Sequence, residues 1–131
     1  MAYPNKTINE GSFGSFQAAA AILLYQRVKF SATAGSDQKP KIDVAGIADR
    51  CIGVAMQPIA LGAYGTIKFI NSPGEQYGIV QGTVACADLL YSQTLGAVGD
   101  ATSGGALKCG IATCTGADGG TVTYVPISAT A

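Results

Sequence analysis

Residue types that could carry out chemistry are few in this chain of 131 residues, and they are scattered along it. Histidine is absent, so a hydrolytic triad would lack its usual base and only a serine–lysine pair remains. Ser103 lies shortly before Lys108, but Gly104 and Gly105 separate them and are typical of a turn. We therefore interpret both as loop residues, and we expect no catalytic site and no enzyme activity.

The acidic residues are also scattered and do not form a cluster. Each lies where a turn or a strand end is expected, and an aspartate at such a position accepts hydrogen bonds from the local backbone. A paired-acid site for glycoside cleavage would have to draw on Asp43, Asp49, Asp88, Asp100 or Asp118. A calcium loop needs closer spacing than that of Asp37, Asp43 and Asp49. Neither site is predicted.

The chain has four cysteines, Cys51, Cys86, Cys109 and Cys114. Cys109 and Cys114 are near each other, but a zinc site needs a second pair or histidines, and neither follows. All four occur among small residues in strand-like segments, where a free thiol packs as a small hydrophobe. We expect free cysteines, no metal and no cofactor.

The composition indicates which partners to expect. Charged residues make up 12% of the chain, against about 25% in a typical soluble domain. This favours a protein whose surface is covered by neighbouring subunits, over a monomer with a Ser/Thr/Gly-rich surface. The net charge of zero argues against nucleic acid as a partner. The longest apolar run, residues 18–25, is too short to span a membrane and no signal peptide is evident, so we expect the protein to stay in the cytoplasm where it is made.

Short alternating segments separated by glycine-rich turns predict an all-β fold. In the first segment, Arg27 and Lys29 alternate with Val28 and Phe30, which predicts one wet face and one apolar face. Asp118-Gly119-Gly120 predicts a tight hairpin. The expected strands cover residues 23–31, 41–44, 52–58, 66–70, 76–84, 107–111 and 122–126.

Two segments stay open: residues 18–22 form a helical turn or an extended lead-in, and residues 85–92 form a helical turn or a short strand, which we favour. The spacing of strands predicts a small β-barrel or β-sandwich of short antiparallel strands with an extended N-terminal arm.

Residues 1–17 are polar and show no sustained period. They are interpreted as a disordered terminus or as an arm that orders against a neighbour, ahead of one barrel-like domain at residues 18–131. As an arm, they would contact the partner through seven residues: Tyr3, Pro4, Asn5, Thr7, Ile8, Phe13 and Phe16.

The order of the short motifs resembles a known family. The chain contains Ile52-Gly53-Val54-Ala55, then a Gly62-to-Ile67 segment, a Val80-x-Gly82 strand, the pair Leu90-Tyr91, Gly110-Ile111-Ala112 and a late Asp118-Gly119 turn. This pattern resembles the small capsid decoration (cement) proteins of tailed double-stranded DNA bacteriophages. The family often has Gly-Asp before its Leu-Tyr pair, whereas this chain has Asp88-Leu89.

The resemblance implies a β-barrel-like virion protein, assembled in the host cytoplasm, that binds the major capsid protein on the outer capsid surface. It also implies self-association, with a trimer favoured, and stabilisation of the head against the pressure of packaged DNA. A virion surface or tail module that binds a receptor or carbohydrate is the alternative. An enzyme of unfamiliar type is the third possibility.

Overall fold

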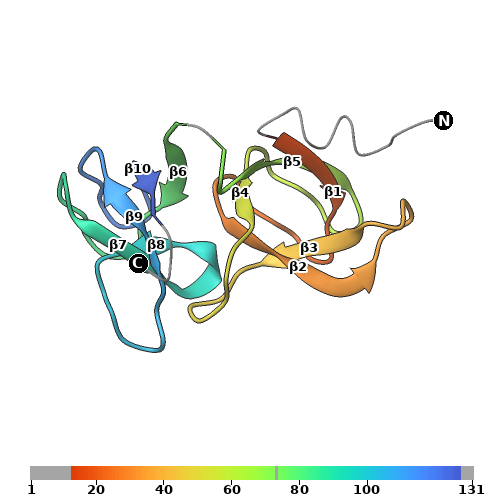
Figure 1. The fold of residues 1–131 in the computed structure, drawn as a ribbon, viewed down its shortest axis with the longest axis horizontal. Helices are drawn as coiled ribbons and strands as arrows, with labels where there is room; N and C mark the ends of the chain where they lie inside the picture. The colour runs from red at the N-terminus through yellow and green to blue at the C-terminus, as the bar shows by residue number, and fades with distance from the viewer. Residues whose placement is uncertain (1–12, 73, 128–131) are drawn as a thin grey trace.

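The computed structural model describes residues 13–72 and 74–127, and these form an all-β protein, as the sequence predicts (Figure 1). The first sheet contains β1 (Phe13–Gln17), β2 (Arg27–Ala34), β3 (Pro40–Val44), β4 (Gly53–Ala55) and β5 (Tyr64–Phe69). The second contains β6 (Gln76–Ile79), β7 (Leu89–Ser92), β8 (Val98–Gly99), β9 (Lys108–Ala112) and β10 (Thr121–Pro126). A short 3-10 turn, η1 (Thr94–Gly96), connects β7 to β8. No α-helix occurs in these two described ranges.

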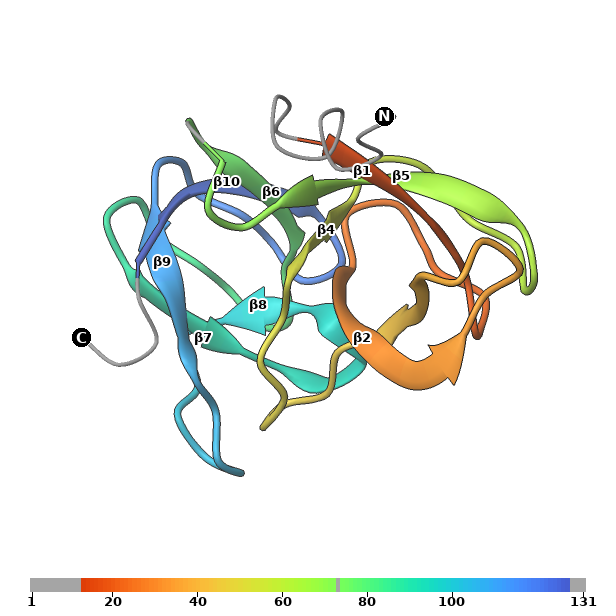
Figure 2. The same cartoon turned by 45° about the vertical axis from the view of Figure 1, so that its right-hand side comes forward.

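The two sheets have the same topology. The strand order is β1-β5-β4-β2-β3 in the first sheet and β6-β10-β9-β7-β8 in the second, and all named strand pairs are antiparallel. Each strand of one sheet therefore has one equivalent in the other. The chain is a tandem pair of one five-stranded unit, which we call the first repeat (residues 13–72) and the second repeat (residues 74–127). The two units lie side by side (Figure 2).

Contacts outside the regular ladders repeat as well. A parallel bridge joins Ala18 to Ile42 in the first repeat, and another joins Val80 to Val98 in the second. A left-handed residue precedes the second strand of each repeat, Tyr25 (φ 68°) in one and Ala87 (φ 72°) in the other. The repeats therefore share local backbone geometry as well as strand order.

Each repeat has its own hydrophobic core. In the first repeat the core consists of Phe16, Ala18, Ile22, Val28, Ile42, Ala55, Ile59 and Ile67. In the second it consists of Val80, Val84, Leu90, Val98, Cys109, Ala112, Val122 and Tyr124. Val80 and Val84 share a buried face, as their spacing predicts. In each repeat the parallel bridge joins the residue that follows the first strand to the third strand, and in the first repeat β1 and β3 are in contact, which curls that sheet into a half-barrel.

The expected N-terminal arm at residues 1–17 requires correction. Phe13–Gln17 form β1, which pairs with β5, and Phe16 contributes to the core. The barrel-like region expected at residues 18–131 therefore begins earlier and, where described, contains two repeats. Phe13 and Phe16 are three residues apart and therefore lie on opposite faces of the strand, so the sequence shows no alternation there. The pairing with β5 supplies the order that the pattern does not show.

The structure decides between the alternatives for the two open segments. Residues 18–22 form no helical turn, because Ala18 and Ile22 each form a bridge and the chain bends at Ala19 and Ala20 between them. Leu89–Ser92 form the strand that we favoured. The expected strand at residues 23–31 begins only at Arg27, because the backbone N–H of Gln26 donates to the carbonyl oxygen of Leu23 and closes a turn. The two-residue strand β8 carries no alternation and was not expected.

Candidate interaction surfaces

The two residues considered as a serine–lysine pair come from a loop and from the strand that follows it. Ser103 lies in the loop before β9 and Lys108 begins that strand. Within residues 13–72 and 74–127, no three His, Cys, Asp or Glu side chains lie together as metal ligands would. The same ranges contain no helix that is both long and apolar enough to cross a membrane.

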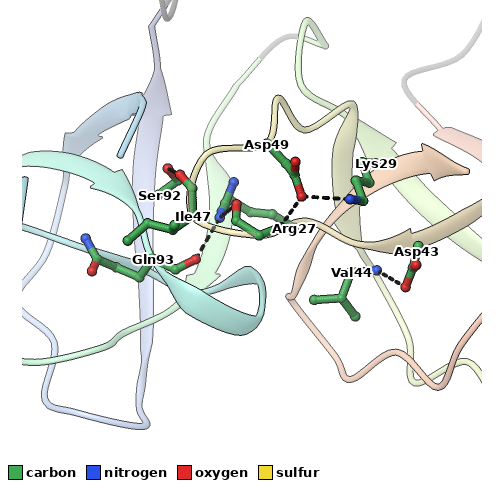
Figure 3. Close-up of polar contacts among 9 residues, drawn as sticks. Arg27, Lys29, Asp43, Val44, Ile47, Asp49, Ser92 and Gln93 are labelled. Carbon is green, nitrogen blue, oxygen red and sulfur yellow. Dashed lines mark hydrogen bonds and ion pairs between the residues drawn. The ribbon is translucent and has the colours of Figure 1, made fainter. Parts of the chain in front are cut away.

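Arg27 is the largest fully buried side chain among the described residues, with 1% exposure. Its guanidinium donates to the carbonyl oxygen of Gln93 (3.2 Å; Figure 3). Its Nε also donates to the carbonyl oxygen of Ala97 (3.1 Å), and the guanidinium donates to that of Gly46 (3.4 Å). Alternation predicted a wet face for Arg27. That prediction is wrong because the second repeat covers this face of β2, so Arg27 links the two repeats.

Gln26 extends this link to a strained residue. Its side-chain amide donates to the carbonyl oxygen of Leu95 (2.8 Å), while its amide oxygen accepts the backbone N–H of Leu23 (2.7 Å). Leu95 has a positive φ of 53°, although it is not glycine, and it is 75% exposed. Such a conformation is unfavourable for a leucine and persists only when neighbouring contacts hold it. Gln26 and Arg27 supply those contacts on both sides of Leu95.

Asp49 organises the turn that accepts a bond from Arg27. Its carboxylate accepts the Gly46 N–H (2.8 Å) and the Lys29 ammonium (2.7 Å). The hydrogen bond from Lys29 is the main reason that the pKa of Asp49 lies below its ordinary value, and the same bond raises the pKa of Lys29. Ser92 adds a further bond between the repeats, from its hydroxyl to the carbonyl oxygen of Ile47.

A cleft of about 370 Å³ lies beside Arg27, and both Cys51 and Cys109 line it. Burial raises the pKa of the Cys51 thiol, and it raises that of Cys109 to about 11. Cys114 differs, because hydrogen bonds from Thr123 lower its pKa. All four cysteines are free. Cys86 is exposed, so the expectation that all four thiols pack as small hydrophobes is wrong for this residue.

These environments predict two classes of thiol. At pH 8, Cys86 and Cys114 should react with a disulfide reagent in the native protein. Cys109 should react only after unfolding, because a thiol with a pKa near 11 is only about one part in a thousand thiolate at that pH. Cys51 should also react slowly in the native protein, because burial raises the pKa of its thiol. The test is to count the thiols that react with the reagent before and after denaturant is added. Cys86→Ser is the control, because it removes one thiol that reacts in the native protein. Four equally fast thiols in the native protein would contradict the expected burial.

All four phenylalanines of the chain line one groove at the open end of the first repeat. The groove has a volume of about 560 Å³ and runs between β1 and the start of β3. Phe16 packs edge-on against Phe30 and Phe69 at its base. Phe13 and Phe30 are 49% and 43% exposed. Lys39 is the charged lining residue, with its ammonium 5.2 Å from the centre of the Phe16 ring. The positions of the four phenylalanines in the sequence did not predict that their side chains would lie together.

A second apolar surface lies on the outer face of the second repeat. Leu89 is paired with Ile111, and Ile111 with Val125, so these three side chains form a row across β7, β9 and β10. We call it the outer row. Ile111 and Val125 are 43% and 48% exposed, and Leu89 is partly buried. The expected strand at residues 107–111 is thus present, but Ile111 lies on the uncovered face.

The predicted contact residues have different outcomes. Tyr3, Pro4, Asn5, Thr7 and Ile8 lie outside the described residues. Phe13 is at the surface and lines the groove. Phe16 is only 7% exposed and belongs to the core, with its ring also lining the groove, so contact of either phenylalanine with a partner stays a prediction. Tyrosines were expected to pack, and Tyr25 stacks on Tyr77 at 4.6 Å across the two repeats, while Tyr124 is fully buried.

Comparison with known proteins shows a similarity of fold. No protein-family model matches the chain, and no curated protein does. Among solved structures, the fold is similar to that of the head fiber gp8.5 N base of bacteriophage phi29, with a TM-score of 0.72 at 18% identity. The fold is shared with a phage head-fiber base. The match covers 89% of this chain and 93% of the phi29 chain, so it includes both repeats, and at this identity it concerns the fold.

Proposed function

We propose that this protein is a structural protein of a phage virion that binds the outer capsid surface where capsid subunits meet. There it stabilises the head against the pressure of the packaged DNA. The observation that supports this most strongly is the similarity of its whole fold to the phi29 head fiber base. The resemblance of its glycine-marked motifs to capsid decoration proteins supports it independently.

The physical properties of the chain suit this role. Zero net charge suits a protein on the outside of a shell, away from DNA. The absence of a clustered metal-ligand set in the described ranges is compatible with a protein that works by shape alone. Several weak contacts made together by one assembly gain from effective concentration, so tight binding needs no single strong site.

The proposal is tested by mixing purified protein with undecorated expanded heads and imaging the particles. We expect ordered added density at subunit junctions. Decorated heads should also retain their DNA at a higher temperature than bare heads, measured as DNA release on heating. Particles without added density would contradict capsid binding, and equal release temperatures would contradict stabilisation.

The N-terminal residues are the proposed capsid anchor, acting by adding a strand to an exposed sheet edge of the capsid protein. Deleting residues 2–12 should weaken co-sedimentation with heads at least tenfold. The deletion ends at residue 12 because Phe13–Gln17 belong to β1, and removing them would damage the fold. Deleting residues 128–131 serves as the control and should leave binding unchanged. Equal binding by both truncated proteins would contradict the anchor role.

A further inference from the structure

The two repeats meet through an interface inside the chain, formed by one surface of each. The equivalent of each of these two surfaces occurs on the other repeat, where it is uncovered. In the internal interface, the first repeat presents the outer face of β2 and β4, and the second repeat receives it through β6, η1 and the start of β8. The second repeat has an equivalent outer face, and the first repeat has an equivalent receiving surface. Among the described residues, neither of these has a partner from the other repeat.

Four residues of the second repeat belong to its receiving surface, and each contacts the first repeat. Tyr77 stacks on Tyr25, and the Ser92 hydroxyl donates to Ile47. Leu95 accepts from Gln26. Gly96 packs against the backbone of Arg27, since a β-carbon on it would meet Arg27 N and O at 3.0 Å.

The equivalent positions in the first repeat line the phenylalanine groove. Phe30 is paired with Ile42 as Ser92 is with Val98, which makes Phe30 equivalent to Ser92. Counting back from Ile42 and Val98 makes Lys39 and Pro40 equivalent to Leu95 and Gly96. The pairing of β1 and β6 with their neighbours makes Ser15 equivalent to Tyr77. Ser15, Phe30, Lys39 and Pro40 all line the groove.

The outer row is the equivalent of the presenting face. Arg27, Val54 and Lys68 form a row across β2, β4 and β5, as Leu89, Ile111 and Val125 do across β7, β9 and β10. The second repeat covers Arg27 and Val54, each 1% exposed, whereas Ile111 is 43% exposed. The polar Arg27 meets carbonyl oxygens, and its counterpart Leu89 would meet phenylalanines. Each presenting row thus matches the chemistry of its receiving surface.

Charge complementarity supports the same pairing. Asp88 is equivalent to Gln26, and it uses one carboxylate oxygen in the same way, accepting the Ala85 N–H at 2.8 Å. The side-chain nitrogen of Gln26 donates to the carbonyl oxygen of Leu95 in the other repeat. Asp88 has its second carboxylate oxygen for a partner, and the position equivalent to Leu95 is Lys39. The carboxylate of Asp88 in one copy would therefore meet the ammonium of Lys39 in the groove of the other copy.

We propose that the phenylalanine groove of one copy binds the outer row of a second copy, which repeats the internal interface between molecules. The contact is heterologous, because two different surfaces meet, so it generates a ring if the rotation closes. Each copy would contribute two repeats to such a ring. This association does not depend on capsid binding.

Two surface variants and their mixture test the proposal. Phe13→Asp places a charge in the groove, and Ile111→Asp places one in the outer row. The wild type should be oligomeric by light scattering and ultracentrifugation, and each variant should be monomeric, with self-association weakened at least tenfold. Mixed in equal amounts, the variants should form a one-to-one dimer, because each retains one intact surface that fits the other. Leu61→Asp, at an exposed site on neither surface, is the control and should assemble as the wild type does.

The mixture makes the outcomes distinct. A monomeric wild type, variants that assemble normally, or a mixture that stays monomeric would each overturn the proposal. If an aspartate variant fails to fold by circular dichroism, a charge exchange replaces it. Lys39→Asp and Asp88→Lys should each weaken association, and the double variant should recover most of it. No recovery in the folded double variant would also overturn the pairing.

Discussion

Replacing Arg27 with methionine is expected to lower the free energy of unfolding by about 3 kcal/mol. Methionine fills similar space but cannot donate to the carbonyl oxygens of Gln93 and Ala97, and these bonds are buried. The carbonyl oxygen of Gln93 would be left without a donor, which costs about 1–3 kcal/mol for a buried acceptor, and that of Ala97 would keep only the bond that it accepts from the Gln93 N–H (2.9 Å). The melting temperature should fall by roughly 10 °C for a chain of this size. Denaturant unfolding and calorimetry measure both quantities.

Arg50→Met is the matched control, since Arg50 lines the same cleft but is exposed, and it should change stability by less than about 0.5 kcal/mol. Arg27→Lys should be intermediate, because one ammonium cannot reach all the acceptors that the guanidinium does. If Arg27→Met melts within two or so degrees of the wild type, about 0.5 kcal/mol, then Arg27 does not hold the repeats together. In that case its burial would be incidental.

The second large effect is expected at Gly53 and Gly110. These glycines occupy equivalent positions, at the start of β4 and within β9. A β-carbon on Gly53 would overlap the carbonyl oxygen of Lys68, and one on Gly110 would overlap that of Val125. Neither oxygen can move without breaking its ladder, because both belong to the neighbouring strand. Gly53→Ala and Gly110→Ala should each cost about 3 kcal/mol or more, at the upper end of overpacking effects.

Gly62→Ala and Gly119→Ala provide the comparison, because these equivalent glycines have open space around them but positive φ angles of 81° and 79°. Only backbone strain acts there, so the expected cost is about 1 kcal/mol. Chemical denaturation of all four variants should give two groups. Equal losses in the two groups would show that close strand approach is not the reason for glycine at residues 53 and 110.

The sequence by itself determined the all-β class, most strand positions and the absence of a focused catalytic motif. Those features depend on local physics: alternation sets which residues face the core, and glycine marks turns. The motifs Ile52-Gly53-Val54-Ala55 and Gly110-Ile111-Ala112 also suggested a family, and their glycines lie where two strands approach too closely for a side chain. This part of the prediction needed no knowledge of how the two halves pack.

Only the tertiary structure decided that the chain is a tandem repeat and which surfaces are uncovered. Equivalent positions carry different residues, such as Arg27 and Leu89, because one is covered by the other repeat and its counterpart is not. Alternation predicts which face of a strand a residue occupies, but it cannot tell whether another unit covers that face. The four phenylalanines meet for the same reason: they come from three strands that are distant in sequence and adjacent only once the half-barrel has formed.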